Sequence, residues 1–193
     1  MGFGNGIPRR KVFISFYGED RYEVDQFLAV CDQDEVFIHR ALGAYDNDDF
    51  IDSTNPEYVM SEIRRTYLAD STVTIVLIGR CTHSRRYVDW ELKASLRQGD
   101  LYVPNGLLGI LLPSAARTRP VYLPPRLAEN LDADERQCYA RIYEYPESTA
   151  EVVDWIEDAF EARSARAHLI ENTQDMMRNN AICRHCDRTH PAG

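Results

Sequence analysis

The sequence lacks several features that would assign it to particular classes of protein. No apolar run approaches the roughly 18 residues that a membrane-spanning helix requires. The N-terminal segment 1–10 has no apolar core of the kind found in signal peptides. The five cysteines are odd in number and lack the spacing of a disulfide framework, so we expect reduced thiols. Together these absences predict a cytoplasmic protein that does not act at a membrane.

Positive charge is also scarce. The chain has 22 Lys and Arg residues against 31 Asp and Glu residues, a formal net charge of −9. Such a balance disfavours nucleic acid as a partner. What is present is a hydrophobic fraction of 44%, which is enough to bury a core. The length of 193 residues then predicts one domain over residues 9–160. We expect residues 161–193 to form a C-terminal helical extension and a flexible tail.

Apolar runs alternate with stretches of helical periodicity along the predicted domain. The runs predict strands at 11–16, 36–38, 72–78, 106–112 and 140–145. Helices are expected at 20–30, from 56 to about 67, at 87–97 and from 149 onward, with a loop at 113–125. This alternation predicts an α/β fold, a flavodoxin-like, doubly wound sheet of about five mostly parallel strands. The run 72–78 is expected to be a central strand.

Glu91 occupies a notable place in this pattern. It lies on the helix that follows the predicted strand 72–78, after a polar loop that contains Ser84. Ligands of α/β sheets bind outside the carboxyl ends of the strands, where such an acid would stand. Taken alone, the position favours a solvated helix acid, because most glutamates on amphipathic helices face water.

Two segments of the chain resemble a known family. The runs 11–16 and 74–79, together with residues 84–92, are similar to the TIR-like domains of the Thoeris anti-phage system, and to its TIR subunit in particular. The resemblance extends to about residue 150 and implies a flavodoxin-like fold. Enzymatic TIR domains cleave the nicotinamide–ribose bond of NAD⁺ with a glutamate on the helix after the third strand. Glu91 falls on that position, so the resemblance implies that it is catalytic.

The resemblance also implies a substrate and partners. NAD⁺ would be the substrate, with no separate cofactor, and a cyclic ADP-ribose isomer would be the second messenger that reaches a separate effector protein. A phage-derived trigger and self-association on activation are implied as well. The residues assigned to substrate binding are Ser15, Phe16, Tyr17, Asp46, Asn47, Ser84 and Tyr87.

Two other interpretations remain open. The chain could be a non-enzymatic TIR adaptor that assembles through its loops. It could also be an enzyme of the nucleoside deoxyribosyltransferase type, which uses a glutamate on a flavodoxin-like sheet. Nicotinamide release from NAD⁺ distinguishes the first from a TIR enzyme, and base exchange on a deoxynucleoside identifies the second.

The end of the chain contains three potential zinc ligands. Cys183, Cys186 and His190 follow one another at short spacing. A structural site needs four ligands, and the remaining cysteines are scattered through the predicted domain. We therefore expect no metal site here, with a half-site completed across a dimer as the alternative.

Overall fold

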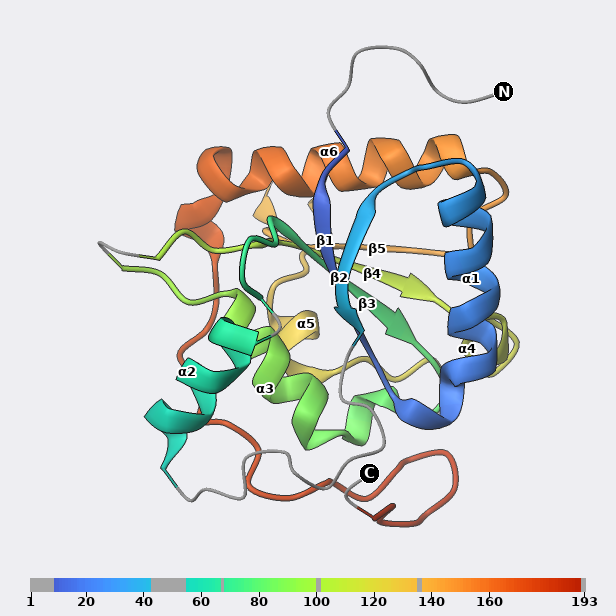
Figure 1. The fold of residues 1–193 in the computed structure, drawn as a ribbon. Coiled ribbons are helices and arrows are strands. Elements are labelled where there is room, and N and C mark those ends of the chain that lie inside the picture. The colour runs from blue at the N-terminus through green and yellow to red at the C-terminus, as the bar shows by residue number, and fades with distance from the viewer. Residues whose placement is uncertain (1–8, 43–54, 67, 100–101, 135–136, 192–193) are drawn as a thin grey trace.

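The computed structural model describes residues 9–42, 55–66, 68–99, 102–134 and 137–191. Within these residues, five strands form one sheet in the order β2-β1-β3-β4-β5 (Figure 1). Every neighbouring pair in the sheet is parallel. The fold is therefore the flavodoxin-like α/β sheet that the alternation of apolar runs predicts.

The central strands are buried on both faces, as continuous apolar runs require in a parallel sheet. Every residue of β3 and β4 is buried. The strands are β1 (Lys11–Phe16), β2 (Ile38–Leu42), β3 (Val73–Ile78), β4 (Gly106–Leu111) and β5 (Arg141–Tyr143). β3 is the middle strand of the five, which confirms the prediction of a central strand at 72–78.

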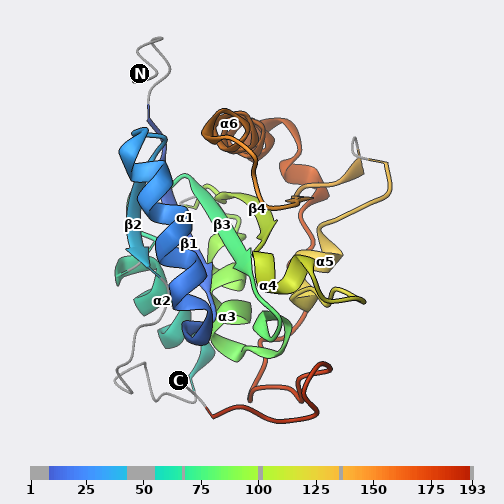
Figure 2. The same cartoon turned by 90° about the vertical axis from the view of Figure 1, so that its right-hand side faces the viewer.

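Helices cover both faces of the sheet (Figures 1 and 2). On one face, Val24 of α1 and Ile156 of α6 join a core with side chains of β1, β3 and β4. On the other face, Phe13 of β1 packs with Val59 of α2 and Ala94 of α3. The helices are α1 (Arg21–Gln33), α2 (Pro56–Thr66), α3 (Arg86–Ser95), α4 (Pro113–Ala116), α5 (Pro125–Glu129) and α6 (Thr149–Ala165).

The predicted position of the second strand is wrong. β2 begins at Ile38, where the predicted strand 36–38 ends. The preceding residues form the turn that leaves α1: Glu35 has a φ of 53°, and the Val36 N–H donates to the Cys31 carbonyl. Val36 is buried in the core beside α1. In the sequence alone, its apolar side chain cannot be distinguished from that of a buried strand residue.

The segment 113–125, predicted to be a loop throughout, begins instead with the short helix α4. Pro113 lies in the first turn of α4. A backbone N–H in the first turn has no hydrogen-bond acceptor within the helix, so proline costs no bond there, and its fixed φ suits a helix. None of the helices in the described part of the chain is long and apolar enough to cross a membrane.

After α6 the chain turns back and runs along α3 (Figure 1). We call residues 171–191 the C-terminal strap. In the described chain beyond Ala165, helical structure is limited to the 3-10 turn Ala167–Leu169. Of the C-terminal helical extension predicted from residue 161, the end of α6 and this turn are helical. The predicted domain boundary at residue 160 falls within α6, and it stays a prediction.

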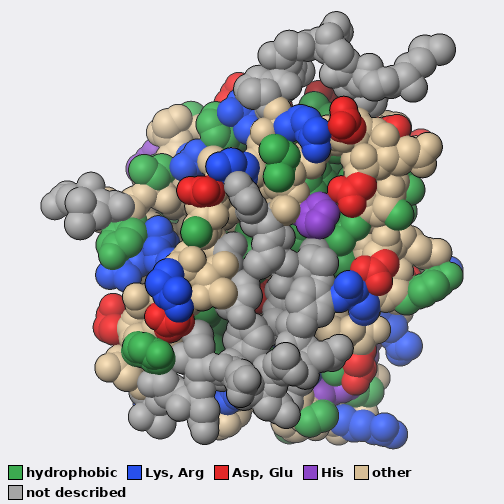
Figure 3. Space-filling model, in the orientation of Figure 1, with side chains coloured by type: hydrophobic (Ala, Val, Ile, Leu, Met, Phe, Trp, Pro, Cys, Tyr) green, Lys and Arg blue, Asp and Glu red, His purple; other side chains and the backbone are tan. Residues whose placement is uncertain are grey.

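The surface of the molecule carries both signs of charge. Figure 3 shows acidic and basic side chains interspersed over one face. With a formal net charge of −9, this mixed surface offers little electrostatic attraction for a polyanion such as nucleic acid.

Gly106 sets the separation between β4 and α6, and this generates a first prediction. A Cβ at Gly106 would overlap the backbone carbonyl of Ala159 in α6, which cannot rotate away. We expect Gly106→Ala to lower the free energy of unfolding by roughly 1–3 kcal/mol, as overpacked cores do. Urea denaturation measures the loss. Gly18→Ala is the control, because nothing lies within 4 Å of its added Cβ. Equal stability of the two variants would contradict the close approach of α6 to the sheet.

Candidate active site

A buried hydrogen bond joins the predicted catalytic acid to the first strand. Ser15 Oγ donates to Glu91 Oε2 over 2.6 Å. Ser15 is fully buried, and Glu91 is only 4% exposed. A hydroxyl at this distance stabilises the ionised carboxylate and fixes its orientation. Glu91 is therefore a buried, oriented carboxylate and not the solvated helix acid that its sequence position alone favours.

The connection from β3 to α3 explains why these two residues meet. β3 pairs with β1, so the chain that leaves β3 at Ile78 emerges beside the end of β1. The 3-10 turn Thr82–Ser84 then leads directly into α3. Asp89, Trp90 and Glu91 are all buried, which shows that α3 is covered on more than one side.

A cavity of about 460 Å³ lies at the same end of the sheet. Tyr17, two residues after Ser15, is part of its wall, whereas Glu91 is not among the lining residues. The Arg85 guanidinium lies 4.1 Å from the centre of the Tyr17 ring, and the Tyr17 hydroxyl lies 3.2 Å from His190 Nδ1. The Tyr17 ring is thus fixed in position between a cation and the C-terminal strap.

Asp20 contributes a second carboxyl group to this end of the sheet, and it lines the cavity. The Thr82 hydroxyl donates to Asp20 Oδ2 over 3.2 Å and accepts the Gly79 N–H over 2.9 Å. Burial raises the pKa of Asp20 to about 7, although the hydrogen bond from Thr82 acts in the opposite direction. Asp20 can therefore gain or lose a proton near neutral pH, as a general acid or base does.

The sequence did not single out Asp20 as a site residue. An acid four residues after the end of a strand is commonplace, and it is mainly burial in the folded protein that gives this one an unusual pKa. The sequence offered one indication of a site residue: Asp20 comes just after β1, and such sheets bind ligands at the carboxyl ends of their strands.

The other predicted binding residues lie in different surroundings. Phe16 is buried in the core beneath α1, on the opposite face of the sheet from Ser15, because successive strand side chains alternate. Ser84 is fully buried, and its Oγ donates to the Cys81 carbonyl over 2.9 Å. The Ser84 carbonyl in turn accepts the Ala181 N–H of the strap over 2.9 Å.

Tyr87 lies farther along α3. Its ring meets the Trp90 ring edge-on, with centroids 5.3 Å apart, and its hydroxyl accepts a hydrogen bond from Arg86 over 3.1 Å. Asp46 and Asn47 lie outside the described residues. The structure thus brings Ser15 to Glu91 and Tyr17 to the cavity, and the binding roles of all seven residues stay predictions.

The strap is fixed on α3 by a buried ion pair and its hydrogen bonds. Arg126 Nε of α5 lies 2.9 Å from Asp89 Oδ1 of α3, and the two side chains are 0% and 5% exposed. Asp89 Oδ2 accepts the Met177 N–H over 2.8 Å, while Arg126 donates to the Asp175 carbonyl over 3.1 Å. Trp90 Nε1 donates to the Met177 carbonyl over 2.7 Å. The helix that carries Glu91 is therefore enclosed between the sheet and the strap.

The parallel sheet in this order, with a buried glutamate on the helix after β3, places the chain among α/β proteins of the flavodoxin-like class. A family model described as "Thoeris protein ThsB, TIR-like domain" matches residues 13–117. Because this match covers more than half of the 193 residues, the chain belongs to that family. This confirms the resemblance noted in the sequence and establishes a defence-associated TIR-like domain. A search of curated protein sequences found no match.

The matched region has a definite relation to the site. It includes Ser15, Asp20 and Glu91 and ends at residue 117, in the connection between α4 and α5. The C-terminal strap lies wholly outside it. The contacts between the strap and α3 are therefore known from this structure and not from the family match.

The raised pKa of Asp20 predicts a dependence of stability on pH. The folded-state pKa of about 7 exceeds the ordinary value of 3.8, so the folded protein holds this proton more tightly than the unfolded chain. This contribution to stability is complete below pH about 4 and is lost as the pH rises through about 7. Asp20→Asn, which stays neutral, should flatten this part of the profile. It should also make the protein more stable than wild type at higher pH. Urea titrations across pH measure both effects, and an unchanged profile in the variant would assign the dependence to another group.

Proposed function

We propose that this chain cleaves NAD⁺ at the nicotinamide–ribose bond and releases a cyclic ADP-ribose isomer, a second messenger for a separate effector protein. The observation that supports this most is the buried hydrogen bond from Ser15 to Glu91. It fixes the Glu91 carboxylate at the end of the sheet where α/β proteins bind nucleotides. Membership in the Thoeris TIR-like family supports the same activity.

One carboxylate is sufficient for this reaction because the leaving group needs no acid. The nicotinamide of NAD⁺ is a pyridinium cation. When the bond from its ring nitrogen to the ribose carbon breaks, the electron pair stays on nitrogen and neutral nicotinamide departs. The ribose becomes a cation of the oxocarbenium type, as in glycoside hydrolysis. The negative charge of Glu91 stabilises that cation, and its oxygens can bind a ribose hydroxyl.

Ser15 acts as a positioning residue in this proposal. Its hydroxyl donates to Glu91 Oε2 from a strand that is buried within the sheet. A carboxylate held by a rigid element loses little energy to reorientation when positive charge develops nearby. The charge is thus in place before the substrate binds.

The nucleophile that reaches the anomeric carbon decides the product. Water gives ADP-ribose, whereas a nitrogen or oxygen atom of the same molecule gives a cyclic isomer after it loses its proton. Cyclisation is favoured when the substrate is folded and water is excluded. Arg80 and Arg188 on the wall of the cavity carry charges that suit a diphosphate.

The remaining parts of the proposal concern partners. The effector would be reached through the diffusible nucleotide, so it needs no docking surface on this chain. A phage-derived trigger would start the reaction, and self-association would accompany it. NAD⁺ is the substrate, and no additional cofactor takes part in the steps above.

Replacement of the carboxylate tests the proposal. Glu91→Gln keeps an oxygen that can accept the Ser15 hydrogen bond but removes the charge that stabilises the ribose cation. We expect nicotinamide release from NAD⁺ to fall by about 10²–10³-fold, the usual cost of removing one electrostatic stabiliser. The free energy of unfolding should change by about 1 kcal/mol, since one buried charged hydrogen bond becomes neutral. Chromatography of nicotinamide and thermal melts provide the two measurements.

Glu129→Gln is the matched control, because Glu129 is an exposed acid on α5. It should release nicotinamide at the wild-type rate. Wild-type turnover in Glu91→Gln would show that Glu91 is not catalytic. If the wild type releases no nicotinamide even with infected-cell lysate, the adaptor interpretation is favoured. Base exchange on a deoxynucleoside would instead favour a deoxyribosyltransferase.

A further inference from the structure

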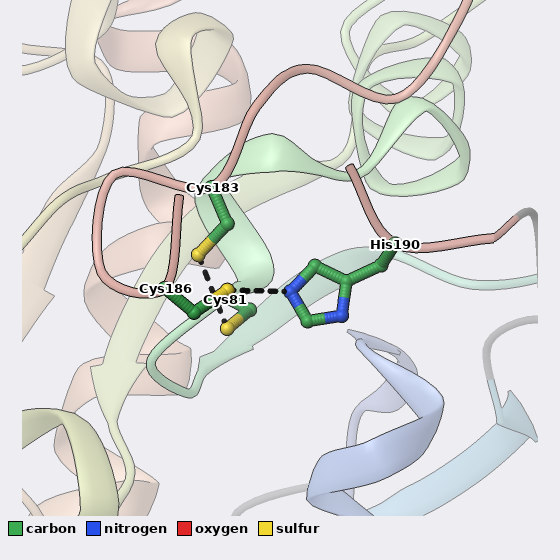
Figure 4. A group of neighbouring side chains, drawn as sticks. All are labelled: Cys81, Cys183, Cys186 and His190. Atoms are coloured by element: carbon green, nitrogen blue, oxygen red, sulfur yellow. Dashed lines mark hydrogen bonds between the residues drawn. The ribbon is translucent and has the colours of Figure 1, made fainter. Parts of the chain in front are cut away.

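Four potential metal ligands converge beside the cavity. Cys81 follows β3, and Cys183, Cys186 and His190 belong to the strap, about one hundred residues later in the chain. One ligand atom from each side chain lies within 4.8 Å of all the others. Figure 4 shows the four side chains pointing toward one another, Cys81 from the loop after β3 and the other three from the strap. The structure thus supplies the fourth ligand that the sequence spacing did not reveal.

We propose that these residues bind one Zn²⁺ ion as a structural Cys₃His site. Zinc in structural sites takes four protein ligands in a tetrahedron, with thiolates and imidazoles preferred. With Zn–S bonds of about 2.3 Å, a tetrahedron separates its sulfur atoms by about 3.8 Å. The Sγ atoms of Cys81 and Cys183 are 3.2 Å apart, and Cys186 Sγ lies 3.1 Å from His190 Nε2. The sulfur atoms of Cys81 and Cys183 would have to move apart by roughly 0.6 Å to reach that geometry, a shift that side-chain rotation can supply.

The orientation of His190 supports metal binding. Its Nε2 faces the sulfur atoms, while its Nδ1 faces outward to the Tyr17 hydroxyl at 3.2 Å and Glu19 at 3.9 Å. A histidine that binds a metal through one nitrogen generally donates the N–H of the other to an oxygen, which fixes the ring. Tyr17 and Glu19 provide oxygen acceptors for such a proton.

The backbone of the strap is folded to present its two cysteines together. Cys183 and Arg188 form an antiparallel bridge, in which the Cys183 N–H donates to the Arg188 carbonyl over 2.8 Å. The Asp187 N–H donates to the Cys183 carbonyl over 2.9 Å, and Asp187 has a φ of 51°. This tight turn lies between Cys183 and His190. The short spacing of Cys183, Cys186 and His190 is therefore built into a hairpin, as in compact zinc sites.

The proposed cluster would carry a net negative charge, and cationic side chains lie around it. Three thiolates, a neutral imidazole and Zn²⁺ together carry one negative charge. Arg188 lines the adjoining cavity. Arg85 donates to the Cys81 carbonyl over 3.4 Å and to the Pro191 carbonyl over 3.5 Å. Both arginines thus adjoin the segments that carry the ligands, where their charges would oppose the negative charge of the cluster.

A disulfide between Cys81 and Cys183 is the competing explanation for their proximity. It would need an oxidant, and it would leave the approach of Cys186 and His190 to the same point unexplained. A metal ion would explain why the ligand atoms of all four side chains converge on one point. Because four protein ligands leave no open position, the ion would be structural and not catalytic.

The proposed ion would join the strap to the loop that precedes the helix of Glu91. Cys81, Cys186 and His190 also line the cavity, so the same ligands form part of its wall. Loss of the metal would release the end of the strap and alter the cavity without touching Glu91. This proposal is independent of NAD⁺ cleavage and is tested without that substrate.

Metal content of the full-length chain tests the site. Protein purified without chelators should contain one equivalent of zinc by elemental mass spectrometry. Replacement with Co²⁺ should give the intense visible bands of a tetrahedral thiolate site. Cys186→Ser and His190→Ala should each lose zinc at least 10-fold more readily to a competing chelator than wild type, because each removes one of four ligands.

Two variants serve as matched controls. His185→Ala removes a histidine of the same hairpin that is not among the four ligands, and Cys31→Ala removes a buried cysteine of α1. Both should keep one equivalent of zinc. Circular dichroism confirms that each variant is folded. Chelation of the wild type should also increase proteolysis within residues 178–191, a readout that does not depend on any substitution.

Three results would overturn the proposal. The first is wild-type protein that neither contains zinc nor binds Co²⁺ in the reduced form. The second is zinc retention in Cys186→Ser equal to that of the controls. The third is a Cys81–Cys183 disulfide found by mass spectrometry in protein from the reducing cytosol.

Discussion

The buried ion pair between Asp89 and Arg126 is the interaction on which the arrangement of the site depends. Arg126 is fully buried, so its charge needs both Asp89 and the carbonyl groups of the strap to replace water. Removal of either partner would leave an uncompensated charge in the interior. The pair thus fixes α3, α5 and the strap relative to one another, and Glu91 lies on α3 only two residues from Asp89.

This constraint connects the two chemical features of the molecule. On the sheet side of α3, Glu91 receives a hydrogen bond from Ser15. Beyond its N-terminus, the loop that contains Cys81 meets the strap at Cys183. The cavity adjoins the second feature, since its wall includes Cys81 together with Tyr17 from the end of β1. The proposed carboxylate chemistry uses α3, and the proposed metal site uses the loop that leads into this helix, so the two sites are neighbours in the chain but use different side chains.

Much of this could be predicted from the sequence. The limits of β1, β3 and β4 follow from continuous apolar runs, and their order follows from the alternation with helices. The residue types around Glu91 allowed the family to be identified. The approach of Ser15 to Glu91 then follows from the adjacency of β1 and β3 in such a sheet.

Other features depend on contacts that leave no local pattern. The strap has little helical or strand structure, so no periodicity indicates that it covers α3. Cys81 is distant in sequence from Cys183, and only the tertiary fold places them together. Asp20 has an ordinary sequence environment, and it is mainly burial in the folded protein that raises its pKa. The most direct test of the central claim is a crystal structure of Glu91→Gln with NAD⁺. We expect a ribose hydroxyl within hydrogen-bonding distance of residue 91 and the nucleotide extending along the wall that contains Tyr17. NAD⁺ bound elsewhere on the molecule, away from residue 91, would contradict the account.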